Sequence, residues 1–132
     1  MTDDRLAALI KAALAARERA YAPYSNYRVG SALETTSGEV FTGCNVENAS
    51  YGLTICAERF AIGAAVAAGH QEFTRVVVAA SGKASPCGAC RQVLAEFGDV
   101  EVVMIDPEGK IIKRRRLDEL LPDQFRLLPP PS

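Results

Sequence analysis

The stretch Ser85-Pro86-Cys87-Gly88-Ala89-Cys90 lies between two apolar runs, Phe73–Ala80 and Val100–Ile105. Each run has the length and composition of a buried strand, and segment 86–97, closed by Gly98, has the pattern of a helix. A strand, a helix and a strand in this order favour parallel pairing through a right-handed crossover. This unit predicts an α/β fold.

The rest of the chain extends the same pattern. The other expected elements are a helix ending before Ala22-Pro23, strands at 28–36, 39–46 and 110–113, and a helix at 57–68. Because Ser37-Gly38 is a turn signal, the strands on either side of it should pair antiparallel. We therefore expect one domain over residues 1–132, a three-layer α/β/α sandwich with a mixed five-stranded sheet, in which 127–132 forms a loose tail.

Composition limits the class of function. The chain has 132 residues, enough for one domain with its own core, and a formal net charge of −1. We therefore expect no overall attraction to nucleic acid or to a membrane surface. No apolar run reaches the roughly 18 residues of a spanning helix, and the acidic start lacks the order of a signal peptide. A cytoplasmic protein is expected.

Cysteines provide the strongest chemical signal. In a reducing compartment, four cysteines favour a metal or catalytic site over a secreted module with two disulfides. Cys87 and Cys90, spaced i and i+3 after a proline, fit the first turn of a helix, where the dipole favours thiolates. Cys56 offers a third sulfur. Three sulfurs leave one position of a tetrahedral zinc open for water, so the sequence predicts a hydrolytic zinc site.

Two charged residues follow Cys56. Glu58 has a simple structural interpretation, because acidic residues are common in the first turn of a helix. Its position two residues after a candidate ligand favours a catalytic acid–base role instead. Three thiolates on Zn²⁺ leave a negative cluster, and Arg59 is placed to offset that charge.

The expected strand at 39–46 carries a polar pair at its end. With a period of two, Asn45 and Glu47 share one face, a placement suited to holding hydroxyl groups. Cys44 points to the other face, and there we interpret it as a small buried hydrophobe.

The helix at 57–68 has no charged residue after Arg59. A helix that is apolar all round is buried all round, and a small domain has little to cover its second side. We therefore expect a neighbouring subunit to do so. His70, the only histidine, follows the end of this helix and is interpreted as a solvated cation.

The motif Cys56-Ala57-Glu58-Arg59, followed by Pro86-Cys87-Gly88-Ala89-Cys90-Arg91-Gln92, resembles the short homotetrameric cytidine deaminases, a branch of the zinc nucleoside deaminases. Further similarity lies in segments 20–25, 43–48 and 119–122. The resemblance implies one Zn²⁺ per subunit, held by Cys56, Cys87 and Cys90. It also implies a proton-shuttling Glu58, which protonates N3 of cytidine or deoxycytidine while water attacks C4 and ammonia leaves. The expected role is pyrimidine salvage.

The same resemblance implies the substrate contacts. Asn45 and Glu47 would hold the ribose hydroxyls, and Tyr27, where relatives often carry Phe, would pack against the nucleoside. Phe125 would reach the pyrimidine of an adjacent subunit in a homotetramer with shared active sites; its simpler interpretation is a hydrophobic anchor for the tail. Arg59 resembles the arginine that hydrogen-bonds a ligand sulfur.

Four alternatives remain. The run Lys113-Arg114-Arg115-Arg116 could make the protein a nucleic-acid deaminase, although such a run more often protects a sheet edge. The substrate could be a nucleoside antibiotic of the blasticidin S type. Cys44 could close a structural Cys₄ zinc site, or Cys87 and Cys90 could form a redox module, which would leave Glu58 unexplained.

Overall fold

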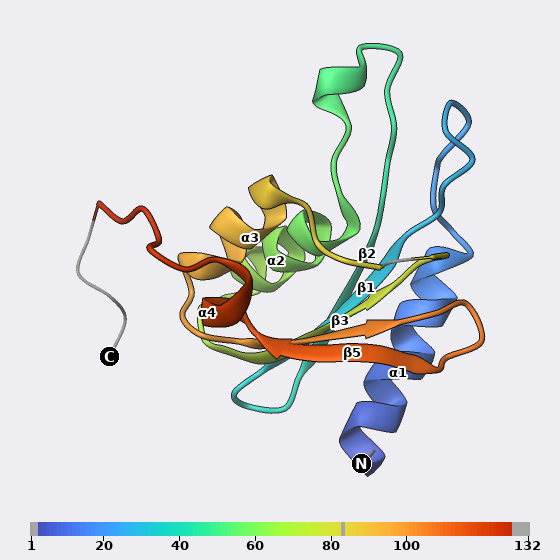
Figure 1. The fold of residues 1–132 in the computed structure, drawn as a ribbon. Coiled ribbons are helices and arrows are strands. Elements are labelled where there is room, and N and C mark those ends of the chain that lie inside the picture. The colour runs from blue at the N-terminus through green and yellow to red at the C-terminus, as the bar shows by residue number, and fades with distance from the viewer. Residues whose placement is uncertain (1–2, 83, 128–132) are drawn as a thin grey trace.

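A computed structural model of the chain describes residues 3–82 and 84–127 (Figure 1). Its five-stranded sheet has the order β2-β1-β3-β4-β5. The strands are β1 (Gly30–Thr35), β2 (Val40–Cys44), β3 (Phe73–Ala79), β4 (Glu101–Ile105) and β5 (Ile111–Arg116). The helices are α1 (Asp4–Arg17), α2 (Ala57–Ala67), α3 (Gly88–Ala95) and α4 (Leu117–Leu120), with a 3₁₀ turn, η1, at Tyr51–Leu53.

The sheet is mixed, as the sequence predicted. The β1–β2 hairpin is antiparallel, and β3 pairs parallel with β4 through the α3 crossover. The alternation of strands and helices from residue 39 to 105 also suggests parallel pairing between the strand at 39–46 and the strand at 73–80, and this expectation was wrong. β2 and β3 run in the same direction but are not neighbours, because β1 lies between them and pairs antiparallel with both. The hairpin leaves one edge of β1 free, and β3 occupies that edge.

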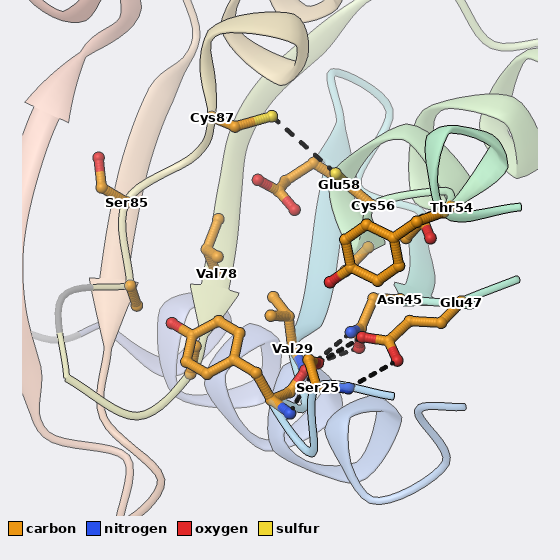
Figure 2. Close-up of a pocket in the computed structure, with 15 residues that line it drawn as sticks. Ser25, Val29, Asn45, Glu47, Thr54, Cys56, Glu58, Val78, Ser85 and Cys87 are labelled. Carbon is orange, nitrogen blue, oxygen red and sulfur yellow. Dashed lines mark hydrogen bonds between the residues drawn. The ribbon is translucent and has the colours of Figure 1, made fainter. Parts of the chain in front are cut away.

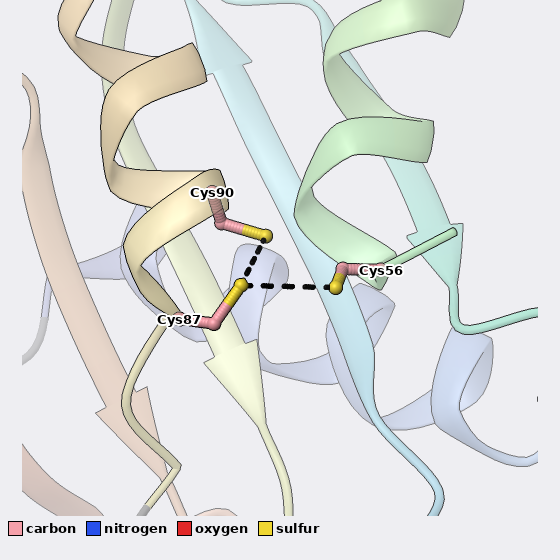
Figure 3. A group of neighbouring side chains, drawn as sticks. All are labelled: Cys56, Cys87 and Cys90. Atoms are coloured by element: carbon pink, nitrogen blue, oxygen red, sulfur yellow. Dashed lines mark hydrogen bonds between the residues drawn. The ribbon is translucent and has the colours of Figure 1, made fainter. Parts of the chain in front are cut away.

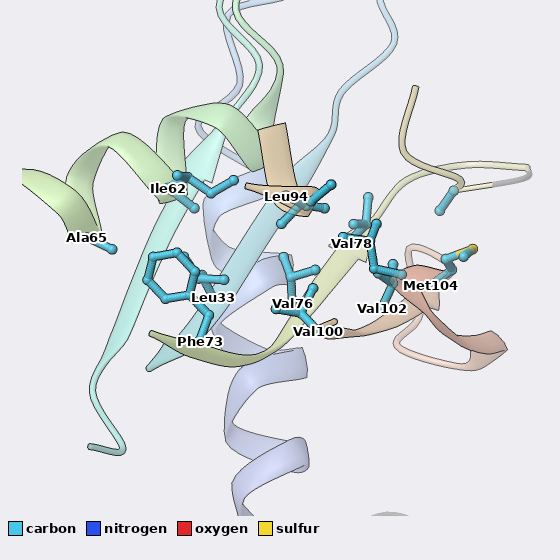
Figure 4. Packing of buried hydrophobic residues seen from close by; sticks show 14 of the residues in the cluster. Leu33, Ile62, Ala65, Phe73, Val76, Val78, Leu94, Val100, Val102 and Met104 are labelled. Carbon is cyan, nitrogen blue, oxygen red and sulfur yellow. The ribbon is translucent and has the colours of Figure 1, made fainter. Parts of the chain in front are cut away.

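Helices cover both faces of the sheet, which confirms the three-layer architecture (Figure 1). On one face α1 packs over the inward side chains of β1, β3 and β4. On the other, α2, α3 and α4 enclose the larger cluster (Figure 4). That cluster includes Leu33, Ile62, Ala65, Phe73, Val76, Val78, Leu94, Val100, Val102 and Met104.

Two glycines allow the helices to approach the sheet closely. A Cβ atom on Gly30 would lie 2.1 Å from the carbonyl oxygen of Ala13 in α1. A Cβ atom on Gly43 would lie 2.3 Å from the carbonyl oxygen of Ala57 in α2. The first turn of α2 therefore rests directly on β2.

Element boundaries differ from the expectations mainly near the C-terminus. β5 continues to Arg116 rather than ending at Lys113, because Arg114 pairs with Glu101 on β4 and Arg116 pairs with Asp99. The short helix α4 follows it without a break. Of the tail expected at 127–132, only residue 127 is described. Within the described residues no helix is long and apolar enough to cross a membrane.

We expect Gly43→Ala to lower the free energy of unfolding, since the new methyl group meets α2 backbone that cannot move alone. Overpacking of this kind costs about 1–3 kcal/mol. Urea denaturation at fixed protein concentration and metal loading measures the change. Gly52→Ala is the matched control, because no atom lies within 4 Å of its added Cβ. Equal stability of the two variants would contradict the close packing of α2 on β2.

Candidate functional site

Three cysteine sulfurs converge where α2 and α3 begin (Figure 3). Cys56 is the N-cap of α2, Cys87 is the N-cap of α3, and Cys90 lies in the first turn of α3. The Cys56–Cys87 and Cys87–Cys90 sulfur distances are 3.9 Å and 3.5 Å. These distances are far longer than the bond of about 2.05 Å in a disulfide. The cluster is a set of free thiols.

The spacing of the sulfurs fits zinc. Zn–S bonds of about 2.3 Å at tetrahedral angles place two sulfurs about 3.8 Å apart, and all three Sγ atoms lie within 4.8 Å of one another. Three thiolates supply three of the four ligands. Cys44 is not part of the cluster; it lies on β2, beside Ala15 and Ala16 of α1. The structural Cys₄ alternative therefore lacks its fourth sulfur among the described residues.

One positively charged side chain, Arg59, lies beside Cys56. Nη2 of Arg59 donates to the sulfur of Cys56 at 3.6 Å and to the carbonyl oxygen of Thr54 at 3.3 Å. The pKa of Cys56 is lowered to about 5, first by a hydrogen bond from the Cys90 thiol and then by Arg59. The pKa of Cys90 is raised, because its thiol is shared with Cys56 and is buried. The prediction that Arg59 lies beside a candidate ligand agrees with this geometry.

Glu58 lies in the first turn of α2 and is only 3% exposed. Burial raises the pKa of its carboxyl group, and the neighbouring Cys56 thiolate raises it further. Figure 2 shows this carboxyl group in the cavity beside Cys56 and Cys87. A carboxyl group with a raised pKa beside a metal site can both accept and donate a proton near neutral pH.

The cavity next to the sulfurs has a volume of about 250 Å³. Glu58, Cys56 and Cys87 lie at one end, and Asn45 and Glu47 lie at the other (Figure 2). Tyr27 also lines the cavity. Except for Phe125, the structure thus brings the site residues predicted from the sequence to one place. Phe125 is 67% exposed and does not line the cavity of its own chain; its carbonyl oxygen accepts a hydrogen bond from Gln92.

Asn45 and Glu47 are both buried and both line the cavity. They follow β2, which ends at Cys44 rather than at 46 as the sequence suggested. The Asn45 amide accepts from the backbone N–H of Val29 at 2.9 Å and donates to the carbonyl oxygen of Tyr27 at 2.8 Å. Glu47 accepts from the backbone N–H groups of Tyr24 and Ser25 and from the Ser25 hydroxyl. These bonds, the one from the hydroxyl first, lower the pKa of Glu47. Both side chains therefore also hold the 24–29 loop against the cavity.

Sequence reasoning missed several polar groups around the cavity. The Tyr27 hydroxyl donates to the carbonyl oxygen of Ser81 at 3.0 Å and links two loops at the cavity wall. The Thr54 hydroxyl lines the cavity and is buried without a hydrogen-bond partner among the described residues. Such a group normally binds a ligand or water. Tyr27 itself was expected at the cavity from the resemblance, but its hydrogen bond to Ser81 was not. Thr54 belongs to no motif with a known spacing, so only the tertiary structure reveals it.

Arg91 directly follows Cys90 in the cysteine motif, and the sequence alone indicates no role for it. Its Nε donates to the carbonyl oxygen of Pro86 at 2.9 Å, Nη1 to that of Leu120 at 2.7 Å, and Nη2 to the Ser85 hydroxyl at 2.8 Å. The guanidinium group thereby joins the segment just before Cys87 to the end of α4. We interpret Arg91 as a positioning residue for this ligand.

An α/β/α sandwich with three zinc-spaced thiols at two helix N-termini, and a buried glutamate beside them, defines a zinc-dependent hydrolytic enzyme as a class. A family model described as the cytidine and deoxycytidylate deaminase zinc-binding region matches residues 3–106. The chain belongs to this family.

Relatives cover nearly the whole chain. A probable cytidine deaminase of Dictyostelium discoideum is 48% identical over 95% of this chain and 86% of its own length. A cytidine deaminase of Halalkalibacterium halodurans is 47% identical over 89% of this chain and 91% of its own. The crystal structure of cytidine deaminase from Burkholderia pseudomallei has a TM-score of 0.86 at 52% identity, covering 95% of this chain and all of that one. A blasticidin-S deaminase of Bacillus cereus is less similar, at 31% identity over 76% of this chain and 79% of its own.

We expect Arg91→Ala to release zinc faster, because the Cys87 segment loses its link to α4. Loss of a group that orients a metal ligand typically costs about 10–100-fold in metal affinity. Transfer of zinc to a colorimetric chelator, followed over time, measures the change. Glu96→Ala, an exposed change at the end of α3, is the control. Identical release rates in the two variants would contradict a positioning role for Arg91.

Proposed function

We propose that this protein catalyses the zinc-dependent hydrolytic deamination of cytidine and deoxycytidine, giving uridine or deoxyuridine and ammonia. The observation that carries the proposal is the cavity that joins three zinc-spaced sulfurs and buried Glu58 to Asn45 and Glu47. The names of the 45–48% identical relatives support the same activity. A role in cytoplasmic pyrimidine salvage follows from this chemistry.

In this proposal Cys56, Cys87 and Cys90 hold one zinc ion. When bound, zinc supplies Lewis-acid activation of the attacking water. The excess negative charge of three thiolates works against that activation. Arg59 donates to the Cys56 sulfur, and the N-termini of α2 and α3 place their dipoles at the ligands, so both reduce the excess.

Glu58 moves the protons. It accepts one from the attacking water and delivers it to N3 of the pyrimidine, which makes C4 more electrophilic. After attack at C4, it takes the second proton of the same water to the amino group, which leaves as ammonia. The raised pKa of the buried carboxyl group suits a residue that must both take up and release a proton.

The polar end of the cavity fits a ribose. Glu47, ionised through its lowered pKa, keeps lone pairs that can accept from sugar hydroxyls, and the Asn45 amide lies beside it. Tyr27 provides an aromatic wall for the nucleoside. A cavity of about 250 Å³ suits a single nucleoside rather than a nucleic-acid strand.

A homotetramer with shared active sites completes the proposal. The outer face of α2 exposes Phe60 and Val66, each 40% accessible, around the small residues Gly63 and Ala64. Contact with a second copy would bury this apolar face. Phe125 is exposed and does not line the cavity of its own chain. It belongs to the segment after α4, which extends away from the sheet (Figure 1), and in the proposed tetramer it reaches a neighbour's site.

We expect Glu58→Gln to keep its zinc and its fold but to lose at least about 10²–10⁴-fold in kcat, the usual contribution of general acid–base catalysis. An ultraviolet assay on cytidine, with zinc content measured in parallel, gives both values. Wild type should lose activity in a strong zinc chelator and should show little turnover of blasticidin S or single-stranded DNA. Near-normal turnover in the variant would refute the shuttle role.

Sharing of sites can be tested by mixing subunits. If Phe125 acts in a neighbour's site, Phe125→Ala chains co-expressed with Glu58→Gln chains should recover activity above the average of the two parents. Mixed assemblies then contain an intact Glu58 paired with an intact Phe125. If sedimentation shows that mixed tetramers have formed but their activity does not recover, Phe125 does not act in a shared site. If the protein is a monomer at micromolar concentration, the proposed tetramer is refuted.

A further inference from the structure

A second cavity lies beside β5, at the opposite edge of the sheet from β2, and is also lined by Arg91 of α3 and Leu120 of α4. Its volume is about 320 Å³, in the range of small-molecule sites. Its lining residues are Ala84, Ser85, Arg91, Met104, Ile112, Lys113, Arg115 and Leu120. Three of these side chains are cationic, and none of these eight is acidic.

The basic run on β5 divides into two faces. Arg114 forms two hydrogen bonds with the Glu101 carboxylate, at 2.9 and 3.0 Å, and Arg116 pairs with Asp99 at 3.1 Å. These two arginines lie opposite the cavity and are neutralised by acids. Lys113 and Arg115 alternate with them and line the cavity, where the described lining supplies no carboxylate. The chain therefore neutralises one face of the run and leaves the other positive.

Arg91 brings a third cation to the same cavity in a fixed orientation. Its bonds to Pro86, Ser85 and Leu120 hold the guanidinium group in place and leave further N–H groups unused, since guanidinium carries five. Like charges gathered in one hollow repel one another, and an anion bound among them removes that repulsion.

We infer that this cavity binds a phosphate-bearing small molecule. A phosphate group accepts hydrogen bonds from Lys113, Arg115 and Arg91, because guanidinium groups match the geometry of phosphate oxygens. Met104, Ile112 and Leu120 supply an apolar wall for the organic part of the ligand. The inferred ligand class is an organic phosphate such as a nucleotide, which is distinct from the uncharged nucleoside of the catalytic site.

This site adjoins the catalytic cavity. Ala84 and Ser85 line both cavities, and Ser85 accepts a hydrogen bond from Arg91 two residues before Cys87. A ligand that binds Arg91 in this cavity would therefore contact a residue that is hydrogen-bonded to the segment just before Cys87, a candidate zinc ligand.

Titration calorimetry at low ionic strength tests the inference, with uridine triphosphate, inorganic tripolyphosphate and orthophosphate as probes on the zinc-loaded protein. The test variant is Lys113→Ala/Arg115→Ala, and the matched control is Lys11→Ala/Arg5→Ala, which removes the same charges from exposed positions on α1. Loss of two charge-assisted hydrogen bonds should weaken uridine triphosphate binding at least about tenfold in the test variant only. Zinc content and cytidine turnover should stay unchanged in both variants.

The three probes separate the possible sources of phosphate. Tighter binding of uridine triphosphate than of tripolyphosphate supports an organic phosphate, through the apolar wall. If each probe binds wild type, the test variant and the control variant with the same affinity, the inference is overturned, since the anion then binds at the zinc or elsewhere. The inference is also overturned if none of the three probes binds wild type at about 1 mM. It is overturned as well if a single-stranded oligonucleotide binds but uridine triphosphate does not.

Discussion

The structure depends on bringing two helix N-termini together at one edge of a sheet. If all three sulfurs, which lie less than 5 Å apart, bind one divalent ion as thiolates, their negative charge exceeds what the ion neutralises, so the site needs further positive charge. The starts of α2 and α3 supply it through their unpaired backbone N–H groups and dipoles, and Arg59 supplies it directly at the Cys56 sulfur. The same N-termini place Glu58 where burial raises its pKa.

Sheet topology makes this meeting possible. The carboxyl ends of β2 and β3 lie at the same edge, because Gly30 at the start of β1 pairs with Cys44 on one side and Ala79 on the other. β2 ends at this edge, and after a loop the chain begins α2 there. β3 ends at the same edge, and after a second loop the chain begins α3 there. Gly43 lets α2 settle on β2 with no side chain between them. The spacing of the three candidate ligands, Cys56, Cys87 and Cys90, is therefore set by how closely the helices pack on the sheet.

The cavity walls show polar residues serving two purposes. Asn45 and Glu47 satisfy backbone groups of the 24–29 loop and also face the space where a sugar would lie. A loop held in this way presents Tyr27 to the cavity and links it to Ser81. Preorganisation of this kind lowers the entropic cost of binding a small substrate.

The sequence alone predicted the helix and strand pattern, the mixed sheet and the pairing of Cys87 with Cys90, because periodicity and an i, i+3 spacing are local properties of the chain. The addition of Cys56 and Glu58 to that pair came from the resemblance of two separate motifs, which the fold brings together across 31 positions. The sequence also predicted that Asn45 and Glu47 lie together, since alternate residues of an extended segment point to the same side whatever the fold. Only the tertiary structure decided the features that arise where distant segments of the chain meet. These are the insertion of β1 between β2 and β3, the link from Arg91 to α4, and the two opposite faces of the basic run on β5. No local pattern encodes these contacts, because their partners are separated along the chain and meet only when the layers pack.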